Sequence, residues 1–214
     1  AGRIHTLCAS VPGKWTLMSC TQGAGLSLKW LRETLRLPQS YGEMDALAAS
    51  VPIGAERLLF LPYLQGERSP HPDPNARGVF FGLSAIHRDS HMIRAVLEGV
   101  AYSQRECVDV FRELGVNVDD MTFTGGGARS ALWRQMLADL YGCPVKTLAN
   151  DEGAALGAAM LAAGALDSRP AVSGAVAPNG GSADAYETYY RVYASLYPMM
   201  KPAFNALTAL GRNA

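Results

Sequence analysis

The chain has 214 residues, 49% of them hydrophobic and 18% charged, and its 19 basic and 19 acidic side chains leave no net charge. This length suits one large domain or two small ones, and a neutral chain lacks the field that attracts nucleic acid or anionic lipid. The apolar content also disfavours disorder, and no apolar run approaches the roughly 20 residues of a membrane helix. We therefore expect a cytoplasmic protein with neither a nucleic-acid nor a membrane partner.

Cysteines and histidines offer no metal or redox motif. The four cysteines lie far apart without a CxxC pair, so we expect reduced and mostly buried thiols at Cys8, Cys20, Cys107 and Cys143. His87 and His91 are four residues apart, but no third ligand and no HExxH motif accompanies them. The sequence therefore predicts solvent-facing histidines and no metal site.

The first sixty residues predict four elements. Two β-rich runs flank Val11-Pro12-Gly13, a tight-turn sequence. Apolar residues then recur every three or four positions, as on one face of a helix. We predict a β-hairpin from residues 3–10 and 14–20, a helix from Gly25 that closes at Leu37-Pro38, a short helix over 44–49 and a buried strand over 57–61.

The middle of the chain predicts a long loop and a long helix. Residues 66–74 are rich in proline, which forbids regular structure, and a strand is expected over 78–83. A helix then begins at an Asp89 or Ser90 cap and ends at Leu114, because an apolar stripe continues to that residue and Gly115 follows as a stop. Its length makes this helix the expected centre of the core.

The last ninety residues alternate between predicted strands and helices. Gly153 and Gly157, four apart, would let another element approach their helix closely, and Pro198 and Pro202 would kink or interrupt the final helix. The order is a strand over 121–124, a glycine turn over 125–127, a helix over 130–141, a strand over 145–148, a helix over 151–163, a loop over 164–183 and a helix over 184–207. This order indicates an α/β domain.

The most informative motif is the stretch from Thr124 to Ser130, TGGGARS, between a strand and a helix. Such a turn presents unpaired backbone N–H groups and the positive end of a helix dipole, and its glycines let a flat base or a ribose lie against the backbone. The pattern is neither GxGxxG nor a P-loop. Spacing alone supports a nucleotide-binding turn and a tight turn without a ligand about equally.

A longer stretch around this motif, residues 123–139, resembles the adenosine motif of the FGGY carbohydrate kinases, and the likeness is closest to the xylulokinase branch. Segments 60–83, 94–102 and 152–159 resemble other motifs of the family in the same order. The resemblance implies a ribonuclease-H-like, actin-type ATPase fold, with a mixed sheet flanked by helices. In this family two domains enclose ATP in the cleft between them.

The resemblance also implies how the chain is divided. Residues 1–214 match the C-terminal nucleotide-binding domain of an FGGY sugar kinase, whereas no segment matches the N-terminal sugar-binding domain. That missing domain supplies the first phosphate-binding hairpin, most sugar contacts and the aspartate that deprotonates the sugar hydroxyl. We therefore assign no catalytic residue and no metal ligand to this chain, and expect it to be inactive alone.

Five residues are carried over as the nucleotide site. The resemblance places Gly126 and Gly127 beneath the adenine and ribose, Ser130 within hydrogen-bonding reach of the nucleoside, and Gly25 near the phosphates. Lys29 stands where relatives often carry a polar residue that reaches the nucleotide, and its ammonium group could meet a phosphate. A solvated surface lysine is the somewhat better supported alternative.

Other polar and aromatic residues receive structural roles. Glu67 and Arg68, adjacent and opposite in charge, are expected to order the long loop as a solvated or paired surface feature rather than to act in catalysis. Trp30 and Trp133 lie among helical apolar residues, so we expect them in the core rather than stacked on a base.

The activity implied by the resemblance is transfer of a phosphoryl group from ATP, with Mg²⁺, to a sugar hydroxyl. D-xylulose, giving the 5-phosphate, is the first candidate, and ribulose, gluconate or glycerol is the alternative acceptor. A non-catalytic nucleotide-binding module is a further alternative. Because Ile4 and Leu7 would normally meet a partner, we also expect self-association, for example as a homodimer.

Overall fold

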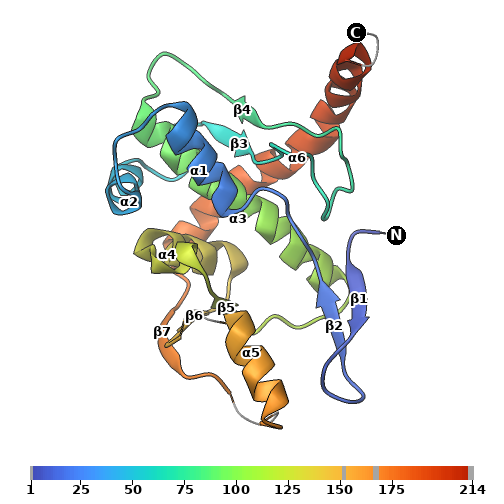
Figure 1. The fold of residues 1–214 in the computed structure, drawn as a ribbon. Helices are drawn as coiled ribbons and strands as arrows, with labels where there is room; N and C mark the ends of the chain where they lie inside the picture. The colour runs from blue at the N-terminus through green and yellow to red at the C-terminus, as the bar shows by residue number, and fades with distance from the viewer. Residues whose placement is uncertain (1, 151–152, 166–168, 212–214) are drawn as a thin grey trace.

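The computed structural model describes residues 2–150, 153–165 and 169–211. Helix α3 (Asp89–Glu113) passes through the middle of the molecule (Figure 1). It packs against strand β3 (Leu59–Leu61) and against four helices: α1 (Gly25–Thr34), α2 (Tyr41–Ala49), α4 (Ala131–Tyr141) and α6 (Gly180–Gly211). Most side chains of α3 from Ile93 to Val110 are buried, so the predicted central role of this helix is confirmed.

The strands form three small sheets. In the third sheet, β5 pairs in parallel with β6, and β6 pairs antiparallel with β7, which makes this sheet mixed. The antiparallel pairs of the other two sheets are β1 (His5–Cys8) with β2 (Trp15–Met18), and β3 with β4 (Val79–Phe81); the third sheet contains β5 (Met121–Phe123), β6 (Val145–Leu148) and β7 (Val172–Val176). The predicted hairpin and the predicted strands are thus confirmed: β6 has the predicted bounds, and the other predicted strands are shorter than expected.

Strand β7 was placed in a loop by the sequence interpretation, and that placement is wrong. Its residues are Val, Ser, Gly, Ala and Val, which have little strand preference as a set. Backbone pairing with β6, in the register that sets Val145 opposite Val176, fixes the extended conformation instead. The extended conformation of β7 therefore depends on its pairing with β6, which the local sequence does not reveal.

Helix α6 also differs from its prediction. It begins at Gly180 and continues through Pro198 and Pro202 to Gly211. Of the two predicted effects of these prolines, an interruption is therefore wrong, and a kink stays a prediction. Both prolines lie on the exposed face of the helix, whereas Tyr193, Leu196, Tyr197 and Phe204 are buried in the core. Burial of these large side chains outweighs the backbone hydrogen bonds that the two prolines remove.

Helix α5 (Gly153–Ala162) was expected to pack closely through its two glycines. None of its described residues is buried. Among the described residues, no heavy atom lies within 4 Å of a Cβ built at Gly157, and at Gly153 the nearest is 3.8 Å away, on Thr124. The predicted close approach is wrong, because α5 lies at the periphery beside β5 and β6 (Figure 1). Residues 151 and 152 of the predicted helix lie outside the described ranges.

A buried polar network joins α2, α3 and α6. The Arg94 Nε atom lies 2.5 Å from Oε1 of Glu98, and Arg94 Nη2 donates to the Tyr186 hydroxyl at 2.6 Å. Arg94 Nη1 also donates to the carbonyl of Ala48 at the end of α2. Glu98 accepts the backbone N–H of Gly54 at 3.1 Å, in the turn that follows α2. These contacts fix the orientation of α2 on the core.

The four cysteines differ in their exposure. All four cysteines are free, but only Cys107 and Cys143 are buried, whereas Cys20 is half-buried and Cys8 is exposed. The prediction of mostly buried thiols therefore holds for two of them.

Within the described ranges, no helix combines the length and the apolar character that crossing a membrane requires.

Candidate functional site

A cavity of about 530 Å³ lies where the start of α1, the first turns of α2 and the turn before α4 meet. Figure 1 shows α1 and α2 on one side of this position and α4 on the other. Four of the five residues predicted for the nucleotide site line it. The lining consists of Gly25, Leu28, Tyr41, Gly42, Asp45, Gly126, Gly127, Arg129, Ser130 and Trp133.

The turn after β5 forms one wall. Gly125 has φ of +82°, which a residue with a side chain rarely adopts, and Gly126–Arg129 then make one turn of 3₁₀ helix. The Ser130 hydroxyl accepts the backbone N–H of Trp133 at 3.0 Å and so caps α4. The predicted order of strand, glycine turn and helix is confirmed, and the short 3₁₀ turn within it was not predicted.

The neighbouring glycines Gly126 and Gly127 differ in their surroundings. A Cβ built at Gly127 would lie 2.7 Å from Cζ3 of Trp133 and 2.9 Å from Cζ of Phe123, so packing alone requires glycine there. A Cβ built at Gly126 would meet no heavy atom within 4 Å. Gly126 therefore leaves room at the cavity wall, whereas Gly127 fits the core side of the turn.

Gly25 and Lys29 were both predicted at the phosphate end of the site. Gly25 begins α1 and lines the cavity, and no side chain caps the first N–H groups of this helix. Lys29 is not among the lining residues; its side chain is 60% exposed, and its Nζ atom lies 3.8 Å from Oε1 of Glu33. The geometry of Lys29 therefore agrees with the surface alternative.

Helix α2 contributes Tyr41, Gly42 and Asp45. The sequence interpretation began this helix at Met44, which left out Tyr41 and Gly42, and it gave Asp45 no role. Ser40 and Glu43 form a capping box, in which the Ser40 hydroxyl accepts the N–H of Glu43 and the Glu43 carboxylate accepts the N–H of Ser40. The Ser-x-x-Glu pattern is visible in the sequence. Read as a cap, it would have started the helix at Tyr41 and placed these residues on one face.

The charges at the cavity come from Asp45 and Arg129. Burial raises the pKa of the Asp45 carboxyl, and a hydrogen bond from the Ser130 side chain partly offsets that rise. The carboxylate thus lies in a partly desolvated position beside the capped start of α4. Such a group can accept hydrogen bonds from a bound molecule.

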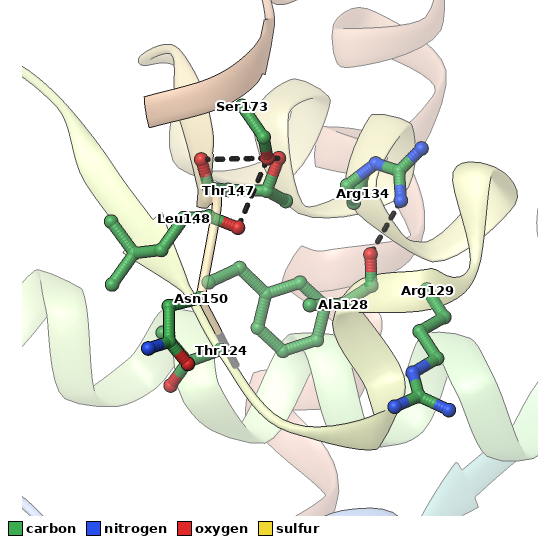
Figure 2. A pocket seen from close by; sticks show the side chains of 9 residues that line it. Thr124, Ala128, Arg129, Arg134, Thr147, Leu148, Asn150 and Ser173 are labelled. Carbon is green, nitrogen blue, oxygen red and sulfur yellow. Dashed lines mark hydrogen bonds between the residues drawn. The ribbon is translucent and has the colours of Figure 1, made fainter. Parts of the chain in front are cut away.

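A smaller pocket, of about 180 Å³, is lined by residues of the turn and of β5, β6 and β7. Figure 2 shows the side chains that line it. Its polar groups are largely engaged within the fold: Arg134 donates to the carbonyl of Ala128, and the Ser173 hydroxyl lies 3.1 Å from Oγ1 of Thr147 and donates to the carbonyl of Leu148 at 3.0 Å. Sites for drug-sized ligands usually measure about 300 to 1,000 Å³. The cavity of about 530 Å³ lies within this range, and the pocket of about 180 Å³ lies below it.

The long loop is ordered by a buried carboxylate. Glu67 is only 5% exposed and accepts the backbone N–H groups of Gln22 and Arg68 at 2.9 and 2.7 Å. Its own backbone pairs with Asp73 across the loop. The expected ordering role is confirmed, but Glu67 is not the solvated group that was predicted. Both N–H groups bond to Oε1, Oε2 is buried without a hydrogen-bond partner among the described residues, and burial raises the pKa of this carboxyl. Arg68 is exposed.

The remaining candidates have structural contacts. His87 accepts the N–H of Ser84 at 2.9 Å, and His91 accepts the N–H of Arg88 at 3.1 Å, at the start of α3. Among the described residues, no three His, Cys, Asp or Glu side chains gather as a metal site. Trp133 is buried and Trp30 stacks on Phe60 with ring centroids 6.1 Å apart, which confirms the prediction that both tryptophans pack in the core.

Comparison with known proteins decides the family. The sequence model of "FGGY family of carbohydrate kinases, C-terminal domain" matches residues 2–166. The chain belongs to this family. It is 39% identical over 208 residues to xylulose kinase of Staphylococcus epidermidis, covering 92% of this chain and 42% of that protein. It is 33% identical to gluconokinase of Bacillus subtilis, covering 96% of this chain and 44% of the relative.

A solved structure extends the comparison to the fold. The crystal structure of xylulose kinase from Rhodospirillum rubrum superposes with a TM-score of 0.87 and 34% identity, over 96% of this chain and 44% of that one. The predicted fold class is thereby confirmed, as an actin-like ATPase fold with a mixed sheet and flanking helices. The chain spans less than half the length of these relatives.

Proposed function

We propose that residues 1–214 form the nucleotide-binding domain of an ATP-dependent sugar kinase, and that D-xylulose is its acceptor, phosphorylated at the 5-hydroxyl. The cavity of about 530 Å³ between α1, α2 and α4 carries this proposal. It brings together Gly25, Gly126, Gly127 and Ser130, which are far apart in the sequence. Its volume lies within the usual range for small-molecule sites.

The adenosine part of ATP would lie against the backbone at Gly126, where no side chain occupies the space. The starts of three helices, α1, α2 and α4, border the cavity. Helix starts carry partial positive charge and therefore favour an anion. The start of α1, which no side chain caps, is the element we assign to the phosphate end of the nucleotide.

Phosphoryl transfer depends on placing the terminal phosphate in line with the acceptor hydroxyl, while a carboxylate takes the proton. In our proposal this chain binds and orients the nucleotide, and the proton-accepting residue lies outside the 214 residues. Magnesium would enter as the counter-ion of the nucleotide phosphates, because the described residues bring no cluster of metal ligands together. No step of the reaction is assigned to a residue of this chain.

We rank the candidate sugar acceptors by how similar this chain is to relatives that are named for each acceptor. The curated relatives named xylulose kinase are 34 to 41% identical to this chain, whereas the one named gluconokinase is 33% identical. D-xylulose is therefore placed first, and gluconate is its main competitor, ahead of ribulose and glycerol. We also propose a cytoplasmic location. Self-association remains a proposal, supported by Leu7 and Trp15 on the first hairpin, which are 48% and 68% exposed.

The test is a phosphorylation assay on the natural gene product that carries residues 1–214. With ATP, we expect a higher kcat/KM for D-xylulose than for D-ribulose, D-gluconate or glycerol. The isolated 214-residue chain should bind ATP but transfer no phosphate to any of these acceptors. Preference for another acceptor would replace the sugar assignment, and nucleotide binding without any transfer by the natural gene product would favour a non-catalytic module.

A further inference from the structure

Asp45 is the acidic residue of the cavity lining. It lies one helical turn after Tyr41, so both residues are on the face of α2 that borders the cavity. The network of Arg94 and Glu98 holds α2 on the core. Asp45 is therefore carried on a fixed helix rather than on a loop, which favours a defined position relative to a bound molecule.

The hydrogen bonding of Asp45 is incomplete. A carboxylate has two oxygens and about four acceptor positions, of which the single hydroxyl proton of Ser130 can fill at most one. The same hydroxyl accepts the N–H of Trp133. No ion pair to Asp45 occurs within the part of the chain that the structure describes. Partial burial thus costs Asp45 hydration that the protein replaces only in part.

The nucleoside offers two kinds of donor for the unused acceptor positions. The 2′ and 3′ hydroxyls of ribose are adjacent, and two adjacent O–H donors match the two oxygens of one carboxylate. The amine of adenine is flanked by ring nitrogens that are themselves acceptors and would repel the second carboxylate oxygen. The ribose diol is therefore the better match.

We propose that Asp45 determines the specificity of the site for a ribonucleotide, by accepting hydrogen bonds from the vicinal hydroxyls of the ribose. This inference rests on the proposed nucleotide site and deepens it, because it names the part of the ligand that the α2 wall recognises. Ser130 then acts as a positioning residue, which caps α4 and orients the Asp45 carboxylate. The sequence analysis expected Ser130 to contact the nucleoside directly; in this proposal Asp45 makes that contact instead.

The test compares the dissociation constants of ATP, 2′-deoxy-ATP and inosine triphosphate, measured by calorimetry on the natural gene product that carries residues 1–214. Wild-type protein should bind ATP about tenfold more tightly than 2′-deoxy-ATP, the size expected for one hydrogen bond to a charged group. In Asp45→Ala this ratio should fall to about one. The ratio of ATP to inosine triphosphate, which lacks the amine, should be the same in both proteins.

Two variants serve as controls. Ala is a good helix former, so Asp45→Ala should fold, and circular dichroism checks this; Asp45→Asn, which keeps one acceptor oxygen, should give an intermediate ratio. Glu33→Gln removes a negative charge from α1 at a position 65% exposed and outside the cavity lining. It should leave the tenfold ratio unchanged.

The outcomes separate the two proposals. If wild-type protein binds ATP but Asp45→Ala keeps the tenfold ribose ratio, the assignment of Asp45 is overturned and the proposed nucleotide site stands. Loss of the ratio between ATP and inosine triphosphate instead would assign Asp45 to the base and overturn the ribose contact. If wild-type protein binds none of the three nucleotides, the proposed function itself is overturned.

Discussion

Two glycines, Gly99 in α3 and Gly126 beside the cavity, are needed for opposite reasons. A Cβ built at Gly99 would lie 2.1 Å from the carbonyl oxygen of Phe60, because the backbones of α3 and β3 touch there. A Cβ built at Gly126 would meet nothing within 4 Å. Packing explains the first glycine completely and the second not at all. In our proposal, the open space at Gly126 is where the nucleotide lies, whereas the protein itself fills the space at Gly99.

The largest effect is expected at the packed glycine. Gly99→Ala forces the backbones of α3 and β3 apart, and we expect the free energy of unfolding to fall by about 3 kcal/mol, at the upper end for overpacked cores. Urea unfolding followed by circular dichroism measures this change. Gly157→Ala is the matched control, because that helical glycine has open space, and we expect a gain of about 0.5 to 1 kcal/mol there.

Gly127 extends the comparison. It is adjacent to Gly126 in the sequence, but, like Gly99, it has no room for a side chain. Gly127→Val would push into Trp133 and Phe123, so the free energy of unfolding should fall by about 2 kcal/mol. Thermal unfolding measures this without any ligand. A Gly127→Val protein as stable as wild type would show that Trp133 and Phe123 move aside easily, and would remove the distinction between Gly126 and Gly127.

Much of the fold follows from local sequence patterns. The glycine turn, the Ser130 cap and α4 appear at their expected positions because the Thr124 to Ser130 motif determines them locally. The site residues Gly25, Gly126, Gly127 and Ser130 were predicted from the family resemblance, and they line one cavity because α1 lies near the turn before α4.

Other features depend on tertiary context. Strand β7 exists through pairing with β6, and α6 continues through two prolines because its opposite face is buried. The Ser40 capping pattern predicts where α2 begins. It does not predict how α2 lies relative to α4, and this arrangement places Asp45 at the cavity. Exposure of Lys29 likewise depends on the angle of α1, which no local pattern determines.

The smallest effect is expected at Lys29. Its ammonium group is exposed and paired with Glu33, and an exposed charge contributes only a screened interaction. Lys29→Ala should therefore change the dissociation constant of ATP by about twofold or less. Calorimetry at two salt concentrations measures this. If Lys29→Ala weakened ATP binding more than tenfold, Lys29 would contact the nucleotide and the proposed site would extend beyond the lining residues of the cavity.

The most direct test of the account is ATP binding by Gly126→Val, compared with wild type and with stability measured in parallel. Because the new side chain enters space that no protein atom occupies, we expect unchanged unfolding. We also expect ATP to bind about 30- to 150-fold more weakly, the equivalent of about 2 to 3 kcal/mol. A folded Gly126→Val protein that binds ATP as tightly as wild type would contradict the placement of the nucleotide in this cavity.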